Sequence, residues 1–412
     1  MTYSLALYLY VLAIILVSPF HKKARLIVKG QWQTFRILKK KIRDDEKYVW
    51  FHAASLGEFE QGRPLMERLR REHPEYKILL TFFSPSGYEV RKNYEGADVI
   101  CYLPFDTPGN VMSFLRLAHP CMAFFIKYEF WNNYLHACHF KNIPVYSVSS
   151  IFRENQVFSR WYGKAYGNVL KCITHFFVQN EFSRELLLRK GFSNVTVVGD
   201  TRFDRVLDIA KQAKELPIVE QFKQGSRLMV AGSSWGPDED LIIPYFNEHP
   251  ELKLIIAPHV IKESHLKEIE GKLQRPSIRY TQVSEENITK ADCLIIDCFG
   301  LLSSIYRYGE IAYVGGGFGS GIHNVPEAAV YGLPVIIGPN NKKFREAQTL
   351  LSLGGCFEVQ DSATFVETMD RLLLDEKFLR ERGQIAGNYI FDNSGASNLV
   401  YEAVFNNSSK ID

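Results

Sequence analysis

Residues 311–329 read IAYVGGGFGSGIHNVPEAA, an apolar run followed by a loop with five glycines and then by the start of a helix. The apolar run at 311–314 predicts a buried strand, and Pro326 suits the first turn of a helix. A strand that leads through such a loop into a helix is typical of parallel α/β sheets, where ligands bind at the carboxyl ends of the strands. The stretch therefore predicts an α/β fold with an anion-binding loop after this strand.

The alternation of strand and helix runs through the rest of the chain in two series. Strands are expected at 48–54, 77–83, 98–103, 121–126, 144–149, 174–179 and 195–198, and again at 227–231, 252–257, 293–297, 311–314 and 334–337. This pattern indicates parallel βαβ units. Because 207–225 is polar and interrupted by Pro217, it is expected to be a linker. We predict two doubly wound, Rossmann-like domains at 44–206 and 226–390, with a cleft between them and a C-terminal tail at 391–412.

Length and composition agree with a folded, two-domain protein. A chain of 412 residues is too long for one ordinary core. With 46% hydrophobic and 23% charged residues it lies near globular averages, which argues against a multi-span membrane protein. A net charge of +3 gives no nucleic-acid signal, so no nucleic-acid partner is expected. The seven cysteines form no C-x-x-C pair, and no metal site is expected.

The N-terminus carries the features of a membrane anchor. Leu5 to Val17 is an unbroken apolar run that Pro19 ends, so residues 1–20 are predicted to form an anchor helix. At ~1.5 Å per residue this helix would nearly match a bilayer core of ~30 Å, and a shallow, monotopic insertion stays open. The basic segment at 21–43 has nine Lys/Arg and no acid, which predicts contact with anionic lipid and a cytoplasmic location for both domains. The alternative is a buried first helix of a soluble domain.

The first candidate for chemistry is HAASLGE at 52–58, directly after the first predicted strand. Small residues and Gly57 are expected to let the backbone turn sharply into a helix. Glu58 would then lie in the first helical turn, at the mouth of the cleft. A carboxylate there can accept a proton from an attacking hydroxyl. It can equally be a helix-start acid that the macrodipole favours.

The second candidate is FFIKYEFW at 124–131. A buried strand is expected to deliver Lys127 and Glu129 to the same cleft edge, on one side of a chain that stays extended. There they would bind or support the acceptor. The alternative is a surface ion pair beside the core residue Trp131.

The second domain offers two strand ends that suit an anion. In AGSSWGP at 231–237, the N–H groups and hydroxyls of Ser233 and Ser234 could meet a phosphate, although an ordinary capped turn fits equally well. In the glycine-rich loop, glycines allow the backbone to approach a ligand closely, and Glu327 could bridge two ribose hydroxyls. The loop is not the G-x-G-x-x-G dinucleotide fingerprint, and a purely structural role for its glycines stays open.

Together these motifs resemble those of the Kdo transferases (3-deoxy-D-manno-octulosonic acid transferases) of lipopolysaccharide synthesis, from the N-terminus to about residue 390. ASLGE at 54–58 resembles A-S-[VL]-G-E, whose Glu is the family's catalytic base, and YEFWNN at 128–133 resembles T-E-L-W-P-N. VGDTRFD at 198–204 is similar to V-x-G-N-x-K-F-D. GIHNVPE at 321–327 matches G-G-H-N-x-x-E, and 332–339 matches G-x-P-V-x-x-G-P. The order and spacing of these pieces are more specific than any one of them.

The resemblance implies a GT-B-type fold, CMP-Kdo as donor and a lipid A precursor similar to lipid IVA as acceptor. It assigns Glu58 as the catalytic base, with Lys127 and Glu129 near the acceptor. The donor nucleotide would be held by Ser233, Ser234, Pro258, His259, Gly316, Gly317, Gly319, His323, Asn324 and Glu327. The sequence departs from the family at Lys127, where an acid is common, at Ala257 in the P-R-H-P loop, and at Ser150 in the N-A-R-L-S segment. These departures suggest a divergent branch.

The predicted function is inverting transfer of Kdo at the cytoplasmic face of a bacterial inner membrane. Expected partners are CMP-Kdo, the lipid acceptor and an anionic membrane surface. No cofactor or metal is expected, because no D-x-D stands at the end of a predicted strand. The alternatives are another membrane-associated GT-B nucleotide-sugar transferase, a nucleotide-sugar epimerase of the same fold, and a non-catalytic membrane tether.

Overall fold

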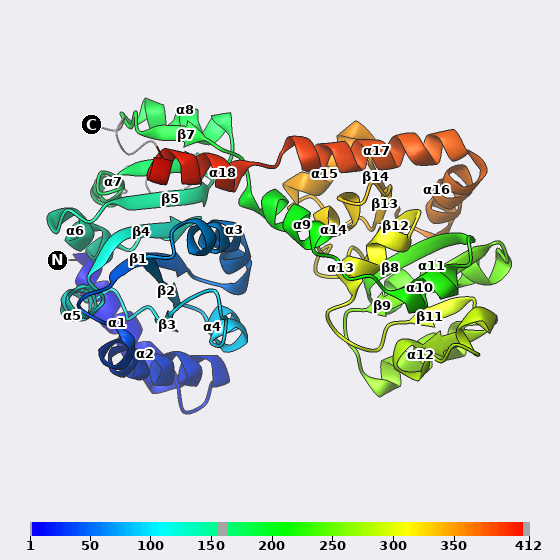
Figure 1. The fold of residues 1–412 in the computed structure, drawn as a ribbon, viewed down its shortest axis with the longest axis horizontal. Coiled ribbons are helices and arrows are strands. Elements are labelled where there is room, and N and C mark those ends of the chain that lie inside the picture. The colour runs from blue at the N-terminus through cyan, green and yellow to red at the C-terminus, as the bar shows by residue number, and fades with distance from the viewer. Residues whose placement is uncertain (1, 155–163, 407–412) are drawn as a thin grey trace. The chain divides into compact units, whose positions relative to one another are not determined.

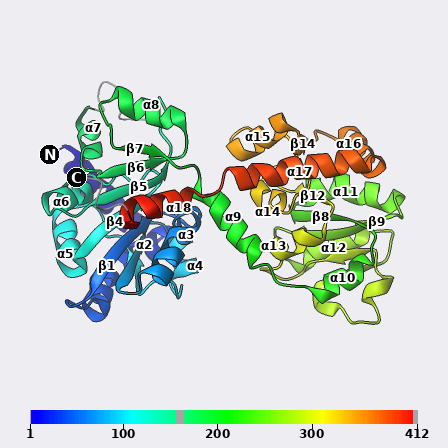
Figure 2. The same ribbon diagram turned by 45° about the horizontal axis from the view of Figure 1, so that its top comes forward.

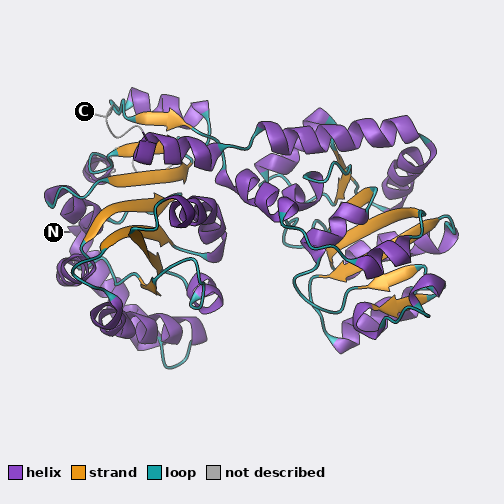
Figure 3. Cartoon of the chain, in the orientation of Figure 1, coloured by secondary structure: helices purple, strands orange, loops and turns teal. Residues whose placement is uncertain are grey.

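The computed structural model describes residues 2–154 and 164–406 (Figure 1). The chain forms two compact units, one made of residues 1–205 and 394–412 and the other of residues 206–393. In its described part, each unit is built on one sheet of seven parallel strands. Figure 3 shows the strands of each unit, in orange, between layers of purple helices.

The sheet of the first unit is doubly wound, with its first strand near the centre. Its order is β3 (Val99–Tyr102), β2 (Tyr76–Phe82), β1 (Lys47–Ala53), β4 (Pro120–Ile126), β5 (Val145–Ser150), β6 (His175–Val178) and β7 (Val195–Val197). All seven strands expected in the first series are therefore confirmed. The strand order reverses between β1 and β4, which pair directly. Such a switch point is where ligands bind in open parallel sheets.

Burial of both faces explains why these strands are almost wholly apolar. Along β1, Trp50 packs into the core on one face of the sheet, while Val49 and Phe51 pack into the core on the other. Successive side chains of a strand point to opposite faces, so a strand covered on both sides needs apolar residues throughout.

Helices cover both faces and one edge of this sheet. They are α1 (Thr2–Val17), α2 (Lys22–Lys41), α3 (Leu56–Glu72), α4 (Pro85–Arg91), α5 (Pro108–Ala118), α6 (Asn132–Phe140), α7 (Lys164–Leu170), α8 (Glu181–Arg189) and the first half of α9 (Thr201–Lys211). The chain returns to this unit at its end, in α18 (Ala396–Tyr401) and the π-helix η6 (Glu402–Asn406).

The expected basic segment is a helix, α2, that is fixed to the edge strand β3. The Gln31 side chain donates to Leu103 O at 2.9 Å and accepts from Phe105 N at 2.7 Å, while Thr34 donates to Tyr102 O at 2.8 Å. The absence of a side chain at Gly30 makes room for the Tyr102 ring, because a Cβ there would lie 2.2 Å from it. This segment is therefore part of the first unit, which begins before the predicted boundary at residue 44.

The second unit has the same architecture. Its sheet order is β10 (Ser277–Arg279), β11 (Cys293–Ile295), β9 (Leu252–Pro258), β8 (Arg227–Ser234), β12 (Ile311–Val314), β13 (Val335–Ile337) and β14 (Cys356–Glu358). The sequence predicts five of these strands and misses the three-residue edge strands β10 and β14. The switch point lies between β8 and β12. Its helices are α10 (Pro217–Lys223), α11 (Gly236–Glu248), α12 (Glu263–Lys272), α13 (Leu302–Ile305), α14 (Val325–Ala329), α15 (Arg345–Leu353), α16 (Ser362–Leu374) and α17 (Glu376–Asp392), with 3-10 turns η3 (Tyr280–Gln282), η4 (Ile288–Lys290) and η5 (Tyr306–Tyr308).

Two of the predicted boundaries are wrong. Residues 207–225 are not a linker, because they contain the end of α9 and all of α10, whose Val219 and Phe222 are fully buried in the second unit. Residues 391–412 are not a plain tail, because α18 packs beside α3 in the first unit (Figure 2) and buries Val400 and Tyr401. The carboxylate of Asp204 holds this segment by accepting the backbone N–H groups of Gly395 and, at 2.7 Å, Ser397.

No single described helix meets the length and hydropathy expected of a membrane span, whereas α1 and α2 do so as a pair bent by 116°.

Candidate active site

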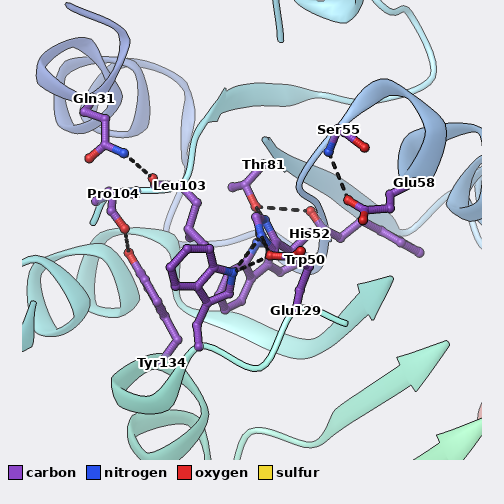
Figure 4. Close-up of polar contacts among 12 residues, drawn as sticks. Gln31, Trp50, His52, Ser55, Glu58, Thr81, Leu103, Pro104, Glu129 and Tyr134 are labelled. Atoms are coloured by element: carbon purple, nitrogen blue, oxygen red, sulfur yellow. Dashed lines mark hydrogen bonds and ion pairs between the residues drawn. The ribbon is translucent and has the colours of Figure 1, made fainter. Parts of the chain in front are cut away.

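Glu58 lies in the first turn of α3, just beyond the end of β1. Its carboxylate accepts a hydrogen bond from the backbone N–H of Ser55 at 3.0 Å (Figure 4), so it does act as a helix-start acid. Gly57 beside it is exposed, and an added Cβ would meet nothing within 4 Å. The sharp turn expected from Gly57 is not needed, because this residue lies inside the helix. The lack of a side chain at Gly57 leaves open surface next to Glu58.

The surroundings of Glu58 favour a proton acceptor. Burial raises the pKa of the Glu58 carboxyl above its ordinary value, and the negative charge of Glu129 raises it further. His52 and Lys127 act in the opposite direction. A carboxylate with a raised pKa is a stronger base near neutral pH. The same influences place both Lys127 and Glu129 within electrostatic reach of Glu58.

A buried polar network runs from the sheet to Glu129 (Figure 4). The indole Nε1–H of Trp131 points at Glu129 Oε2, 2.8 Å away, and at His52 Nε2, 3.1 Å away. The imidazole of His52 is fully buried and its Nδ1 lies 2.9 Å from the hydroxyl of Thr81. Sequence reasoning missed this arrangement, although His52 stands in the quoted motif. The network fixes the orientation of Glu129 and so of the charge that acts on Glu58.

Lys127 contradicts the expectation of an extended chain through 127–129. Its φ is 64°, in the left-handed region, although its N–H still donates to Val148 O at 2.9 Å. The backbone therefore turns directly after β4, and this turn brings Glu129 towards Glu58. Left-handed backbone at a residue other than glycine is strained and is found often at functional sites.

In the second unit, the glycine-rich loop after β12 packs backbone against backbone. A Cβ at Gly315 would lie 2.4 Å from Ser233 O, and one at Gly317 would lie 2.6 Å from Gly338. Gly316 has a φ of 93°, which glycine adopts without strain. Packing alone thus demands these three glycines. The same packing brings the loop beside the turn after β8, at the switch point of this sheet.

The turn after β8 contains two buried carboxylates that the sequence did not predict. Asp238 Oδ2 accepts the N–H groups of Trp235 and Gly316, each at 2.9 Å. The hydroxyl of Ser234 donates to Glu239 Oε1 at 2.8 Å. The Ser234 hydroxyl, which the sequence offered to a phosphate, is therefore already engaged with a carboxylate. The run of acids in GPDED at the start of α11 was the signal for such a pair.

Three aromatic rings gather at the same place, one from each of three loops. The ring of His259 stacks on Trp235 at 4.9 Å and on His323 at 4.2 Å between centroids. Trp235 Nε1–H donates to His323 Nε2 at 3.2 Å. Burial and the neighbouring His259 lower the pKa of His323. A pocket of about 260 Å³ adjoins the cluster and is lined by Trp235, Pro237, Asp238, Gly316, Phe318, Gly319 and Ser320.

The other predicted donor residues lie in the loops around this cluster. Pro258 pairs with Ser234 across the sheet, and His259 N–H donates to Ser234 O at 2.9 Å, so these loops are joined. Asn324 donates to Glu327 Oε1 at 2.6 Å. Because α14 spans only Val325–Ala329, any anion effect of its dipole is confined to one turn. Among the residues that the structure describes, no group of three or more His, Cys, Asp or Glu could hold a metal ion.

The fold has close counterparts among solved structures. The UDP-GlcNAc 2-epimerase from Neisseria meningitidis, solved bound to UDP-GlcNAc, superposes with a TM-score of 0.61, covering 87% of this chain and all of that one at 17% identity. At that identity the likeness concerns the fold alone. The chain thus has the GT-B type of architecture, with two Rossmann-like units.

Sequence comparison is more specific about the kind of enzyme. Residues 29–205 match the family described as 3-deoxy-D-manno-octulosonic-acid transferase (kdotransferase). The 3-deoxy-D-manno-octulosonic acid transferase of Aquifex aeolicus is 27% identical over 85% of this chain and 94% of its own length. That of Chlamydophila psittaci is 28% identical over 75% of this chain and 73% of its own length. These matches identify the chain as a homologue of the Kdo transferases, and therefore as a glycosyltransferase.

Proposed function

We propose that this glycosyltransferase moves Kdo from CMP-Kdo to a hydroxyl of a lipid A precursor similar to lipid IVA, with inversion at the anomeric carbon. The observation that carries the proposal is the half-buried carboxylate of Glu58. It lies beside open surface at the switch point of its sheet, with a pKa raised by burial and by Glu129. Glu58 removes the proton of the acceptor hydroxyl, whose oxygen then attacks the anomeric carbon.

The donor nucleotide is assigned to the loops at the switch point of the second unit. The bond from the anomeric carbon to the phosphate oxygen breaks, and CMP leaves with the electron pair. Imidazoles at His259 and His323, together with the loop backbone, offer donors for that charge. Glu327 is suited to the ribose. Because a monophosphate leaving group carries less charge than a diphosphate, we propose that transfer needs no metal ion.

Helix α1 supports a place at the membrane surface. It is apolar on all sides, yet only the face that bears Leu7 packs on the unit, where the Tyr3 hydroxyl donates to Asp106 Oδ2 at 2.8 Å. The opposite face exposes Leu5, Leu9, Leu12 and Leu16. A helix fixed along one side in this way fits insertion parallel to the membrane plane. We propose this shallow attachment, with both units on the cytoplasmic side.

The surface of α2 suits the charged part of a lipid. A groove of about 350 Å³ is lined by Ser18, Arg25, Val28, Lys29, Trp32, Gln33 and Arg36. The adjoining pocket of about 190 Å³ is mostly apolar and includes Val11, Ile15 and Phe35. Cationic side chains beside apolar space match an anionic head group with acyl chains. The membrane lipid and the phosphorylated acceptor are both proposed partners of this surface.

The direct test incubates the purified full chain with CMP-Kdo and a tetra-acylated lipid A precursor in detergent. CMP release is followed, and the mass of the lipid is measured by mass spectrometry to detect added Kdo. One arm replaces CMP-Kdo with UDP-GlcNAc and looks for transfer or epimerisation, and another adds EDTA. We expect Kdo addition only with CMP-Kdo and no effect of EDTA. Turnover of UDP-GlcNAc, or CMP release without lipid product, would overturn the proposal.

A further inference from the structure

A closed ring of hydrogen bonds joins the loops after β8 and β9, and it links two residues assigned to the donor, Ser234 and His259, to two that are not, Glu239 and His265. Glu239, fully buried on α11, accepts the Ser234 hydroxyl at Oε1 and lies 2.8 Å from His265 Nε2 through Oε2. The other nitrogen of His265, Nδ1, lies 3.1 Å from Val260 O. His259 N–H closes the ring by donating to Ser234 O. The ring thus ties together Ser233–Ser234 and the loop that carries His259.

With Glu239 ionised, this ring calls for a protonated imidazole. Both nitrogens of His265 face acceptors, a carboxylate oxygen and a carbonyl oxygen, and an imidazole can donate from both only as the cation. The imidazolium also neutralises Glu239, which would otherwise be an isolated buried charge. The titratable groups that face His265 are Glu239 from α11 and Glu268 from its own helix, and both favour the cation.

We propose that Glu239 and His265 are positioning residues of the donor site, which hold His259 and Ser233 in place and release them when His265 loses its proton. The proposal rests on the assignment of CMP-Kdo to this unit. Neither side chain needs to touch the donor. They act on it through the two loops that they join.

The direction of the pH effect follows from the pair. Burial alone would lower the pKa of His265, but the hydrogen bonds to Glu239 and Val260 and the charge of Glu239 raise it above its ordinary value. A raised folded-state pKa means that the ring's contribution is fully present below the unfolded pKa of about 6.5 and is lost as the pH rises through the raised value. The donor loops should therefore loosen as the pH rises through the raised pKa of His265.

One substitution separates this mechanism from a merely structural role. In Glu239→Gln, the amide oxygen accepts from Ser234, and the amide N–H donates to a neutral His265 that keeps its Nδ1–H on Val260 O. The ring then closes without a charge, so the loops that carry Ser233 and His259 should stay ordered at high pH. In Glu239→Ala and His265→Ala the ring is broken at every pH. His249→Ala, at the opposite end of α11, is the control histidine.

The experiment measures the dissociation constant of CMP by calorimetry from about pH 7 to about pH 9.5, where the phosphate is already doubly ionised (second pKa about 6). Hydrogen–deuterium exchange of the peptide that covers 257–262 is followed over the same range, with rates corrected for the intrinsic effect of pH. For the wild type and His249→Ala, we expect CMP binding to weaken about tenfold and protection of the loop to fall. For Glu239→Gln both profiles should be flat, and for the two alanine variants binding should be weak throughout.

The positioning role and the donor assignment fail separately. If the loop exchanges as expected but CMP does not bind, the positioning role stands and the donor assignment falls. If Glu239→Ala leaves protection of the loop unchanged, or if Glu239→Gln keeps the wild-type pH dependence, the positioning role is refuted.

Discussion

Membrane attachment through α1 can be tested by two substitutions on its exposed face, Leu9→Ser and Leu16→Ser together. Point changes are preferable to deletion of the helix, because deletion would also uncover the surface on which Leu7 and Tyr10 pack. Leu9 and Leu16 are 61% and 65% exposed, so the first unit loses little when they change. Any effect on lipid binding then reports the contact of this face with the bilayer.

The size of the effect follows from the exposed area. Full burial of a leucine side chain is worth about 1.5–3 kcal/mol, so covering roughly two-thirds of it gains about 1–2 kcal/mol. Two leucines give about 2–4 kcal/mol, which is about a 30- to 900-fold change in partition. The cations of α2 add about 1 kcal/mol each only at low salt, because the screening length falls from ~10 Å at 0.1 M to ~3 Å at 1 M. The difference between the proteins should therefore be clearest in 1 M salt.

The assay is co-sedimentation with vesicles of phosphatidylcholine and phosphatidylglycerol at low and high salt. Leu374→Ser in α16 is the matched control, because Leu374 is 87% exposed but lies in the second unit. We expect the wild type and the control to stay bound in 1 M salt and the double variant to be released. If the double variant binds as the wild type does, or if salt alone removes the wild type, the exposed face of α1 is not inserted in lipid.

Four substitutions test the remaining sites. Glu58→Gln should abolish transfer and leave CMP affinity unchanged; near wild-type turnover would exclude Glu58 as the base. Glu129→Gln removes a charge that raises the pKa of Glu58, so the acidic limb of the pH profile of kcat/KM should move to lower pH, and an unmoved limb would deny this coupling. Glu327→Ala should weaken CMP binding by about 1–3 kcal/mol in calorimetry, whereas an equal dissociation constant would make Glu327 an ordinary helix residue. Asp204→Ala leaves two backbone amides of the C-terminal segment without their acceptor. It should lower the free energy of unfolding, measured in urea, by about 2–4 kcal/mol. An unchanged free energy of unfolding would mean that these contacts do not stabilise the first unit.

The sequence predicted the sheets better than their borders. Most of the buried parallel strands contain a run of apolar residues, so every long strand was recognisable. The edge strands β10 and β14 were missed because each is short and carries a charged residue, whereas β11 and β13 have the same length but are buried throughout. The mistaken linker shows a second limit. Helix α10 has seven residues and buries two of them, Val219 and Phe222; with Pro217 at its start and polar residues on both sides, the stretch resembled a loop.

In the candidate sites, the sequence predicted the residues that follow strands but not the contacts between distant residues. Glu58, Lys127 and the glycine-rich loop follow strands directly, so the rule for parallel sheets located them. The contacts that orient the two sites join residues far apart in the sequence, because Trp131 is 79 residues from His52 and His265 is 26 residues from Glu239. Such pairs depend on three-dimensional proximity, which hydrophobic periodicity does not report. The resemblance to Kdo transferases supplied the role of Glu58, which position alone left open.

The return of α18 to the first unit has a consequence for synthesis on the ribosome. The core of that unit includes Val400, Tyr401 and Val404, so its last apolar contacts are made only when nearly the whole chain has emerged. The second unit is continuous from 206 to 393 and can complete its own core earlier, although it is translated later. Until α18 has been translated, the nascent first unit exposes both the apolar surface on which α18 packs and the apolar face of α1. A premature stop anywhere before residue 396 should therefore leave an aggregation-prone product, even when both sheets have been fully translated.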